Sequence, residues 1–133
     1  MRTVFLDTVG LLALWDETDQ WHSAAARAFN QLAGDAAVLT TTSLVLAETA
    51  NAAARRPYRS AVARLRERME AAGHVIWPSA EEWDAAWSAY ARGEAGDAGL
   101  VDHVSFAVMR RLGLTEAFTN DAHFRAAGLV ILF

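Results

Sequence analysis

The sequence predicts a single-domain α/β protein, a three-layer α/β/α sandwich whose central sheet is mostly parallel. Apolar runs of four or five residues alternate with helical segments along the whole chain of 133 residues. Short strands separated by helices are typical of parallel sheets, which helices cover on both faces. The length suits one compact domain, and no internal repeat or low-complexity tract divides it. Residues 1–133 are therefore expected to form one unit.

The first half of the chain has two predicted strands among four predicted helices. Strands are indicated by β-branched and aromatic runs, and helices by apolar residues at helical spacing. Gly34 ends the second helix, Ser43 is the expected N-cap of the third, and Pro57 breaks the third helix. In order, the elements are a strand at Thr3–Leu6, helices at about 9–15 and 22–33, a strand at Ala37–Thr40, and helices from about Ser43 to Arg55 and from beyond Pro57 to Gly73.

The second half repeats the alternation. Its elements are a strand at His74–Trp77, a helix opened by Pro78-Ser79, a Gly-rich charged loop at Arg92–Gly99, a helix from about Leu100 to Leu112, a strand near Glu116–Thr119, a helical turn near Asp121–Ala127 and a last strand at Leu129–Leu132. Trp83, Trp87 and Tyr90 lie at helical spacing, which favours a place in the core or in a dimer interface over a base-stacking platform.

Composition excludes several classes of protein. The chain has no cysteine, so disulfides and thiolate metal sites are excluded and a cytoplasmic protein is the default expectation. It has no lysine, and therefore no P-loop. The first apolar run is too short for a signal peptide, and no run is long enough to cross a membrane. A net charge of −4 argues against broad electrostatic binding to nucleic acid, although a local metal-bridged contact stays open.

Four acidic residues stand in otherwise apolar segments, where a solvated charge is unexpected. Asp7 ends Val4–Leu6, Glu48 follows Leu44–Ala47, Asp102 lies between Leu100-Val101 and Val104–Phe106, and Asp121 follows Ala117–Asn120. A buried carboxylate must be paired, protonated or bound to a cation. Few cations are placed to pair with these four, so the set predicts a divalent-metal site.

The predicted topology brings these acids together. Asp7 and Asp121 each follow a strand, and functional groups of open α/β sheets gather beyond the carboxyl ends of the strands. Two carboxylates about 4 Å apart repel by roughly 4 kcal/mol at an effective dielectric constant of about 20, so a cluster needs raised pKa values or a cation. Oxygen ligands suit Mg²⁺ or Mn²⁺, and such a site can hydrolyse a phosphodiester with activated water.

Each acid also has a structural interpretation. Asp7 and Asp102 could cap helices, and Asp121 before a helical turn fits ordinary capping chemistry. Glu48 is harder to explain in this way, because the apolar residues around it predict a helix buried on most sides. The four positions together favour function.

Four segments resemble the PIN-domain nucleases, most closely the VapC-type toxins of bacterial toxin–antitoxin pairs. They are Phe5–Thr8, Thr42–Asn51, Leu100–Met109 and Thr119–Phe124, in the order of the family and spanning essentially the whole chain. The resemblance implies a PIN-like fold and a metal-dependent ribonuclease, inhibited by a cognate VapB-like antitoxin and usually a homodimer.

Carried over position by position, the resemblance makes Asp7, Glu48 and Asp102 the core metal ligands, with Asp121 as a fourth acid that often acts through water. Thr8 and Thr119 match positions where a hydroxyl supports the site. Gly99 departs from the pattern, since similar sequences often carry Ser or Thr there, which puts one supporting hydroxyl in doubt.

The remaining polar residues carry weaker signals. The four histidines share no zinc-site spacing, and His123 is expected to pack, with Phe124, the turn after Asp121. The arginines of the middle segment fit a solvated helical face, RNA backbone contacts, or docking of an acidic antitoxin segment. Arg55 and Arg56 are the best placed of them, because they end the helix that carries Glu48.

The function expected from the sequence is a Mg²⁺- or Mn²⁺-dependent endoribonuclease of the VapC type. The alternative is a PIN-fold module that binds RNA or a protein without cutting. A metal phosphatase is less favoured, because no D-x-D motif follows the first strand. Which RNA is cut, and which antitoxin binds, cannot be read from these residues.

Overall fold

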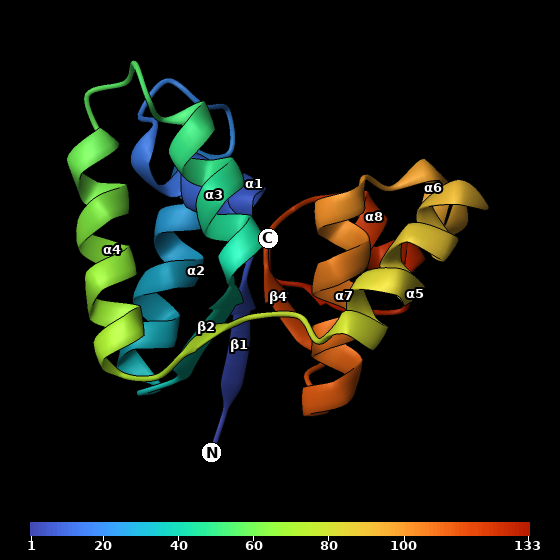
Figure 1. The fold of residues 1–133 in the computed structure, drawn as a ribbon. Helices are drawn as coiled ribbons and strands as arrows, with labels where there is room; N and C mark the ends of the chain where they lie inside the picture. Colours follow the sequence, from blue (N-terminus) through green and yellow to red (C-terminus); the bar gives the residue numbers. More distant parts are fainter.

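The computed structural model describes all 133 residues and contains one five-stranded sheet in the order β3-β2-β1-β4-β5 (Figure 1). Its strands are β1 (Thr3–Leu6), β2 (Val38–Thr42), β3 (Val75–Ile76), β4 (Glu116–Phe118) and β5 (Val130–Ile131). All four strand pairs are parallel, so the predicted fold class is confirmed and the sheet is parallel throughout. The first strand of the chain is thus the central one.

Eight helices cover the sheet. They are α1 (Thr8–Trp15), α2 (His22–Gly34), α3 (Ser43–Ala52), α4 (Arg59–Ala71), α5 (Ala80–Ala91), α6 (Glu94–Asp97), α7 (Leu100–Leu112) and α8 (Ala122–Ala126). Figure 1 shows α1 to α4 on one side of the strands and α5 to α8 on the other, which gives the three predicted layers. The hydrophobic core forms along the strands, where Val4–Leu6, Ala117 and Phe118 are fully buried. Helices on both faces require this near-continuous apolar run.

Helix α1 packs unusually closely on β4. A Cβ atom at Gly10 would lie 2.0 Å from the carbonyl oxygen of Phe118 and 2.7 Å from its ring. No side chain fits at that distance, and the obstacle is backbone, which cannot swing away. The absence of a side chain at Gly10 therefore allows the start of α1 to come close to the end of β4. Asp7 directly precedes α1, and its backbone N–H donates to Phe118 of β4.

Two predicted boundaries in the α3 region are wrong. The N-cap is Thr42, whose side-chain oxygen accepts a hydrogen bond from the backbone N–H of Val45 at 3.1 Å. Thr42 also pairs with Ile76 of β3, which keeps it extended as a cap must be. The helix ends at Ala52, so Arg55 and Arg56 lie in the connection to α4.

The predicted charged loop after α5 contains the short turn α6, with left-handed backbone at Ala95 and Gly96.

The aromatic residues of α5 do not enter the core. Trp83, Trp87 and Tyr90 are 38%, 46% and 48% exposed, and successive rings meet edge to face. The core interpretation is wrong because α5 packs on α7 through the small side chain of Ala86, which is buried beside Val104 and Val108.

No helix of the chain has the length and apolar character that crossing a bilayer requires.

Candidate active site

Three of the four predicted acids meet at the carboxyl edge of the sheet. Asp7 directly follows β1, Asp121 lies just beyond the neighbouring strand β4, and Asp102 sits in the first turn of α7. The chain order along the sheet reverses at β1, because β2 lies on one side of it and β4 on the other. Crevices at such reversals are the usual binding sites of open α/β sheets.

Asp7 is the most deeply buried of the acids, with 1% of its surface exposed. Its Oδ2 accepts a hydrogen bond of 2.9 Å from the hydroxyl of Thr119, while its Oδ1 is buried without any partner. Burial, and then the charges of Asp102 and Asp121, raise its pKa to about 7 against the opposing effect of Thr119. Asp7 stands at the N-cap of α1 but makes no capping hydrogen bond, so capping does not explain it.

Asp102 is partly buried and lies among other negative charges. Burial, followed by the charges of Asp121 and Glu48, raises its pKa to about 6, and His123 opposes the shift. The alternative of Asp102 as a helix cap is wrong, because the N-cap of α7 is Gly99. Its carboxylate is held near two other acids at an energetic cost, as expected for a group that binds a cation.

Asp121 does cap a helix, and it also belongs to the acidic cluster. Its Oδ1 accepts a hydrogen bond of 2.9 Å from the backbone N–H of His123 at the start of α8. Thr119 connects it to Asp7, because the same hydroxyl that donates to Asp7 accepts from the backbone N–H of Asp121 at 3.0 Å. Thr119 therefore holds both acids in place, in keeping with its predicted supporting position.

Glu48 and Thr8 lie differently from the prediction. Glu48 is exposed, because α3 buries Val45, Leu46 and Thr49 and turns Ala47 and Glu48 outward, so the expectation of a buried glutamate is wrong. Its charge nevertheless acts on Asp102. The Thr8 hydroxyl donates to the carbonyl of Val45 at 3.4 Å and accepts from Thr49 at 3.2 Å. It ties α1 to α3, and only its backbone N–H favours the Asp7 carboxylate.

His123 is the residue that sequence reasoning missed. Its Nδ1 lies 3.0 Å from Oδ1 of Asp121 and 3.7 Å from Oδ2 of Asp102. Packing of the turn is the role of Phe124, which is fully buried, whereas the His123 side chain is 40% exposed. The available signal was its position two residues after Asp121, which places both side chains at the start of one short helix.

These residues fit a divalent cation. Asp102, Asp121 and His123 offer ligand atoms that all lie within 4.8 Å of one another. The unpartnered Oδ1 of Asp7 is a buried acceptor next to them, and no arginine forms an ion pair with these carboxylates. Carboxylate-rich sites of this kind suit hard ions.

The raised pKa values predict how stability depends on pH. Asp7 is protonated in the folded state up to about pH 7, but in the unfolded chain only up to about its ordinary value of 3.8. Its contribution to the free energy of unfolding is full below that value and is lost as the pH rises towards 7. In EDTA, the wild type should therefore lose stability relative to Asp7→Asn between pH 5 and about pH 8, measured by urea unfolding at each pH. Parallel stability curves for the two proteins would contradict the shift.

The predicted arginine positions are not equivalent. Arg56 forms an ion pair of 2.9 Å with Asp16 and lies over the ring of Tyr58, so its charge holds two loops together. Arg55 is exposed and forms no ion pair within the chain. Arg66 pairs with Glu70 one turn away, as a solvated helical face predicts.

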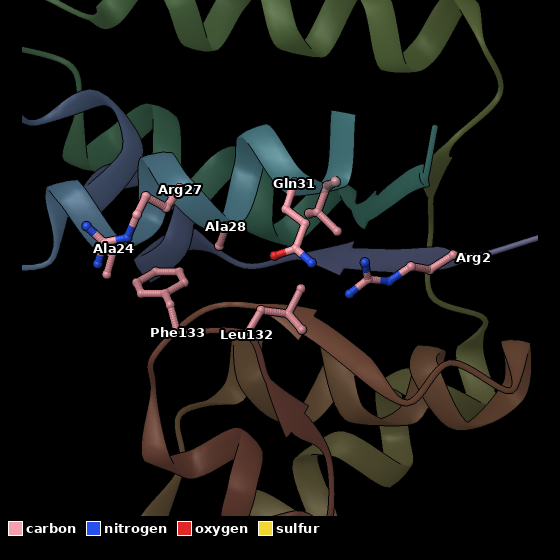
Figure 2. A pocket seen from close by; sticks show the side chains of 8 residues that line it. Arg2, Ala24, Arg27, Ala28, Gln31, Leu132 and Phe133 are labelled. Atoms are coloured by element: carbon pink, nitrogen blue, oxygen red, sulfur yellow. The ribbon is translucent and has the colours of Figure 1, made fainter. Parts of the chain in front are cut away.

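A cavity of about 430 Å³ lies apart from the acidic cluster. Figure 2 shows it between α2, which contributes Arg27 and Gln31, and the last residues of the chain, Leu132 and Phe133. Arg2, at its edge, precedes β1, whereas Asp7 follows it. The lining includes no acidic residue, so the cavity and the candidate site are separate features.

Comparison with known proteins agrees with this geometry. The family model described as "PIN domain" matches residues 4–129. The chain belongs to the PIN-domain family. A PIN-domain relative, the 23S rRNA-specific endonuclease VapC20 of Mycobacterium tuberculosis, is 34% identical over 128 residues, which is 96% of this chain and 95% of the relative. The resemblance to VapC-type proteins predicted from the motifs is therefore confirmed.

Solved structures of other proteins share this PIN fold. The crystal structure of M. tuberculosis VapC20, described as a sarcin–ricin loop cleaving toxin, superposes with a TM-score of 0.81 at 30% identity and covers 96% of both chains. FitAcB from Neisseria gonorrhoeae superposes with a TM-score of 0.64 at 18% identity, covering 98% of this chain and 96% of that one, and supports the fold alone.

Proposed function

We propose that this chain is a metal-dependent endoribonuclease, the toxin component of a VapBC-type toxin–antitoxin system. The observation that carries the proposal is that the charges of Asp102 and Asp121 act on the buried carboxyl group of Asp7, whose Oδ1 has no hydrogen-bond partner. A site built this way is costly to the fold, and a bound cation removes the cost.

In the proposed site, Asp7, Glu48, Asp102 and Asp121 hold Mg²⁺ or Mn²⁺. The cation supplies a water of lowered pKa and neutralises charge on the scissile phosphate. Thr119 fixes the orientation of Asp7 and the backbone of Asp121. Glu48 reaches the site from the exposed side of α3, where a large substrate has access. Residues 1–133 act as one nuclease domain.

The substrate is RNA, and the sarcin–ricin loop of 23S rRNA is the first candidate, because the relative with 34% identity over nearly its full length is specific for 23S rRNA. Arg55 is available for the RNA backbone or for an acidic segment of a VapB-like antitoxin, whereas Arg56 has to leave Asp16 to do so. The proposal includes a cytoplasmic protein and a homodimer. The exposed aromatic face of α5 supports the dimer, since such faces are typical of interfaces.

The test is cleavage of a sarcin–ricin loop oligonucleotide and of total RNA, with fragment ends mapped by primer extension. We expect discrete ends with Mg²⁺ or Mn²⁺ and none with EDTA. Asp102→Asn should lower the rate by about 10²-fold or more, because a metal ion stabilises the transition state by several kcal/mol. Asp84→Asn, which removes an exposed acid of α5, is the matched control. Cleavage that survives EDTA would refute the metal mechanism. No cleavage of any RNA at excess protein would favour the non-cleaving binding module.

A further inference from the structure

The side chain of His123 points into the acidic cluster although its backbone already holds Asp121. The backbone N–H of His123 donates to Oδ1 of Asp121, and the ring Nδ1 lies 3.0 Å from the same oxygen. The capping of α8 therefore needs no imidazole. The ring also reaches towards Asp102 on α7, at 3.7 Å, so it bridges two elements at the place where their charges meet.

The nitrogen lies within the most compact ligand set of the site. Nδ1 of His123 and the carboxylates of Asp102 and Asp121 lie within 4.8 Å of one another, while Glu48 is outside this set. An independent observation also points to a bound ligand. Oδ1 of Asp7 is buried without a hydrogen-bond partner, and the negative charges of Asp102 and Asp121 act on the same carboxyl group.

The other histidines do not share this arrangement. His103 follows Asp102 directly in the sequence but is buried on another face of α7, where it lines a cavity with Glu94 and Arg110. His74 directly precedes β3, which β2 separates from β1, and its carbonyl oxygen accepts from Thr41 of β2 and not from any residue of the acidic cluster. His123, by contrast, is partly exposed and has its Nδ1 near the carboxylates of Asp102 and Asp121.

We propose that Nδ1 of His123 is a direct ligand of the cation, which makes the site a mixed nitrogen and oxygen site that favours Mn²⁺ over Mg²⁺. The inference rests on the proposed metal-dependent function and refines it. Mg²⁺ is a hard ion that prefers oxygen ligands and keeps its waters, whereas imidazole suits the softer transition metals. Mn²⁺ accepts both kinds of ligand, so the histidine adds to its affinity and adds little to that of Mg²⁺.

The test detects the nitrogen directly. Mn²⁺ is bound to the full chain, and electron spin-echo envelope modulation measures coupling of the metal to ¹⁴N. We expect imidazole coupling in the wild type and in the control His74→Gln, and none in His123→Gln. The glutamine variant keeps the backbone N–H that caps α8, so the fold is preserved, which circular dichroism checks.

Metal titration by calorimetry gives a second measurement. His123→Gln should weaken Mn²⁺ binding by at least about tenfold, the scale on which even outer ligand partners act, and should change Mg²⁺ binding by less than about threefold. Bound Mn²⁺ without ¹⁴N coupling in the wild type, or coupling that persists in His123→Gln, would overturn the inference and leave the nuclease proposal standing. A wild-type protein that binds no Mn²⁺ or Mg²⁺ would overturn both.

Discussion

Replacing Asp7 by asparagine is expected to raise the melting temperature of the metal-free protein at pH 8 and to lower RNA cleavage by about 10²-fold or more. The opposite signs have one cause. Asp7 is buried near two other acids, with one oxygen unpartnered and a pKa raised to about 7. Its charge destabilises the empty site and is the feature that binds the cation.

The expected stabilisation is large for a single substitution. A carboxyl whose pKa moves from 3.8 to about 7 loses on the order of 4 kcal/mol when it is ionised in the folded state. Asparagine removes that loss and still accepts the hydrogen bond from Thr119, although its amide has to be buried as well. A net gain of 1 kcal/mol corresponds to roughly 2–8 °C, measured by scanning calorimetry in EDTA.

The exposed control Asp84→Asn should change neither quantity. A lower melting temperature for Asp7→Asn would show that Asp7 is structural and that crowding of acids does not govern this site. Unchanged cleavage would remove Asp7 from the proposed mechanism.

Gly10→Ala should destabilise the fold by about 3 kcal/mol, at the upper end of the cost of overpacking. The added methyl group would lie 2.0 Å from the Phe118 carbonyl oxygen, so α1 has to move away from β4. Helix propensity alone favours alanine by about 1 kcal/mol, so the expected loss goes against the local preference. Urea unfolding measures the change.

Gly34→Ala is the matched control, because a Cβ at Gly34 meets no atom within 4 Å. It should be neutral or slightly stabilising. Because α1 directly follows Asp7 and β4 directly precedes Thr119, Gly10→Ala should also weaken metal binding. Equal stability of the two alanine variants would refute the close approach.

The parts of the site that sequence could predict are those fixed by chain order. Asp7 and Asp121 follow strands, and in a parallel sheet all strand ends of one kind meet at one edge. The alternation of strands and helices predicted the three layers, because helices that connect parallel strands cover the two faces of the sheet. Local pattern was enough wherever a residue's position depends on the element that precedes it.

The errors arose where tertiary packing chooses a helix face. The apolar residues around Glu48 occupy most of a helical turn, so their spacing does not say which position faces outward. Trp83, Trp87 and Tyr90 do share a face, as their spacing predicts, but α7 packs on a neighbouring face through Ala86. His123 joins the cluster because α7 brings Asp102 to it, and no pattern within α8 contains that information.

The hydrogen bond between Thr119 and Asp7 joins residues 112 positions apart. A nascent chain emerging from the ribosome therefore carries its first acid long before the hydroxyl that orients it has been synthesised. Premature stop codons and stalled translation yield fragments with isolated carboxylates and no assembled cation site. If the proposed activity is directed at rRNA, the ribosome that makes this protein meets the competent form only after Thr119 has been synthesised.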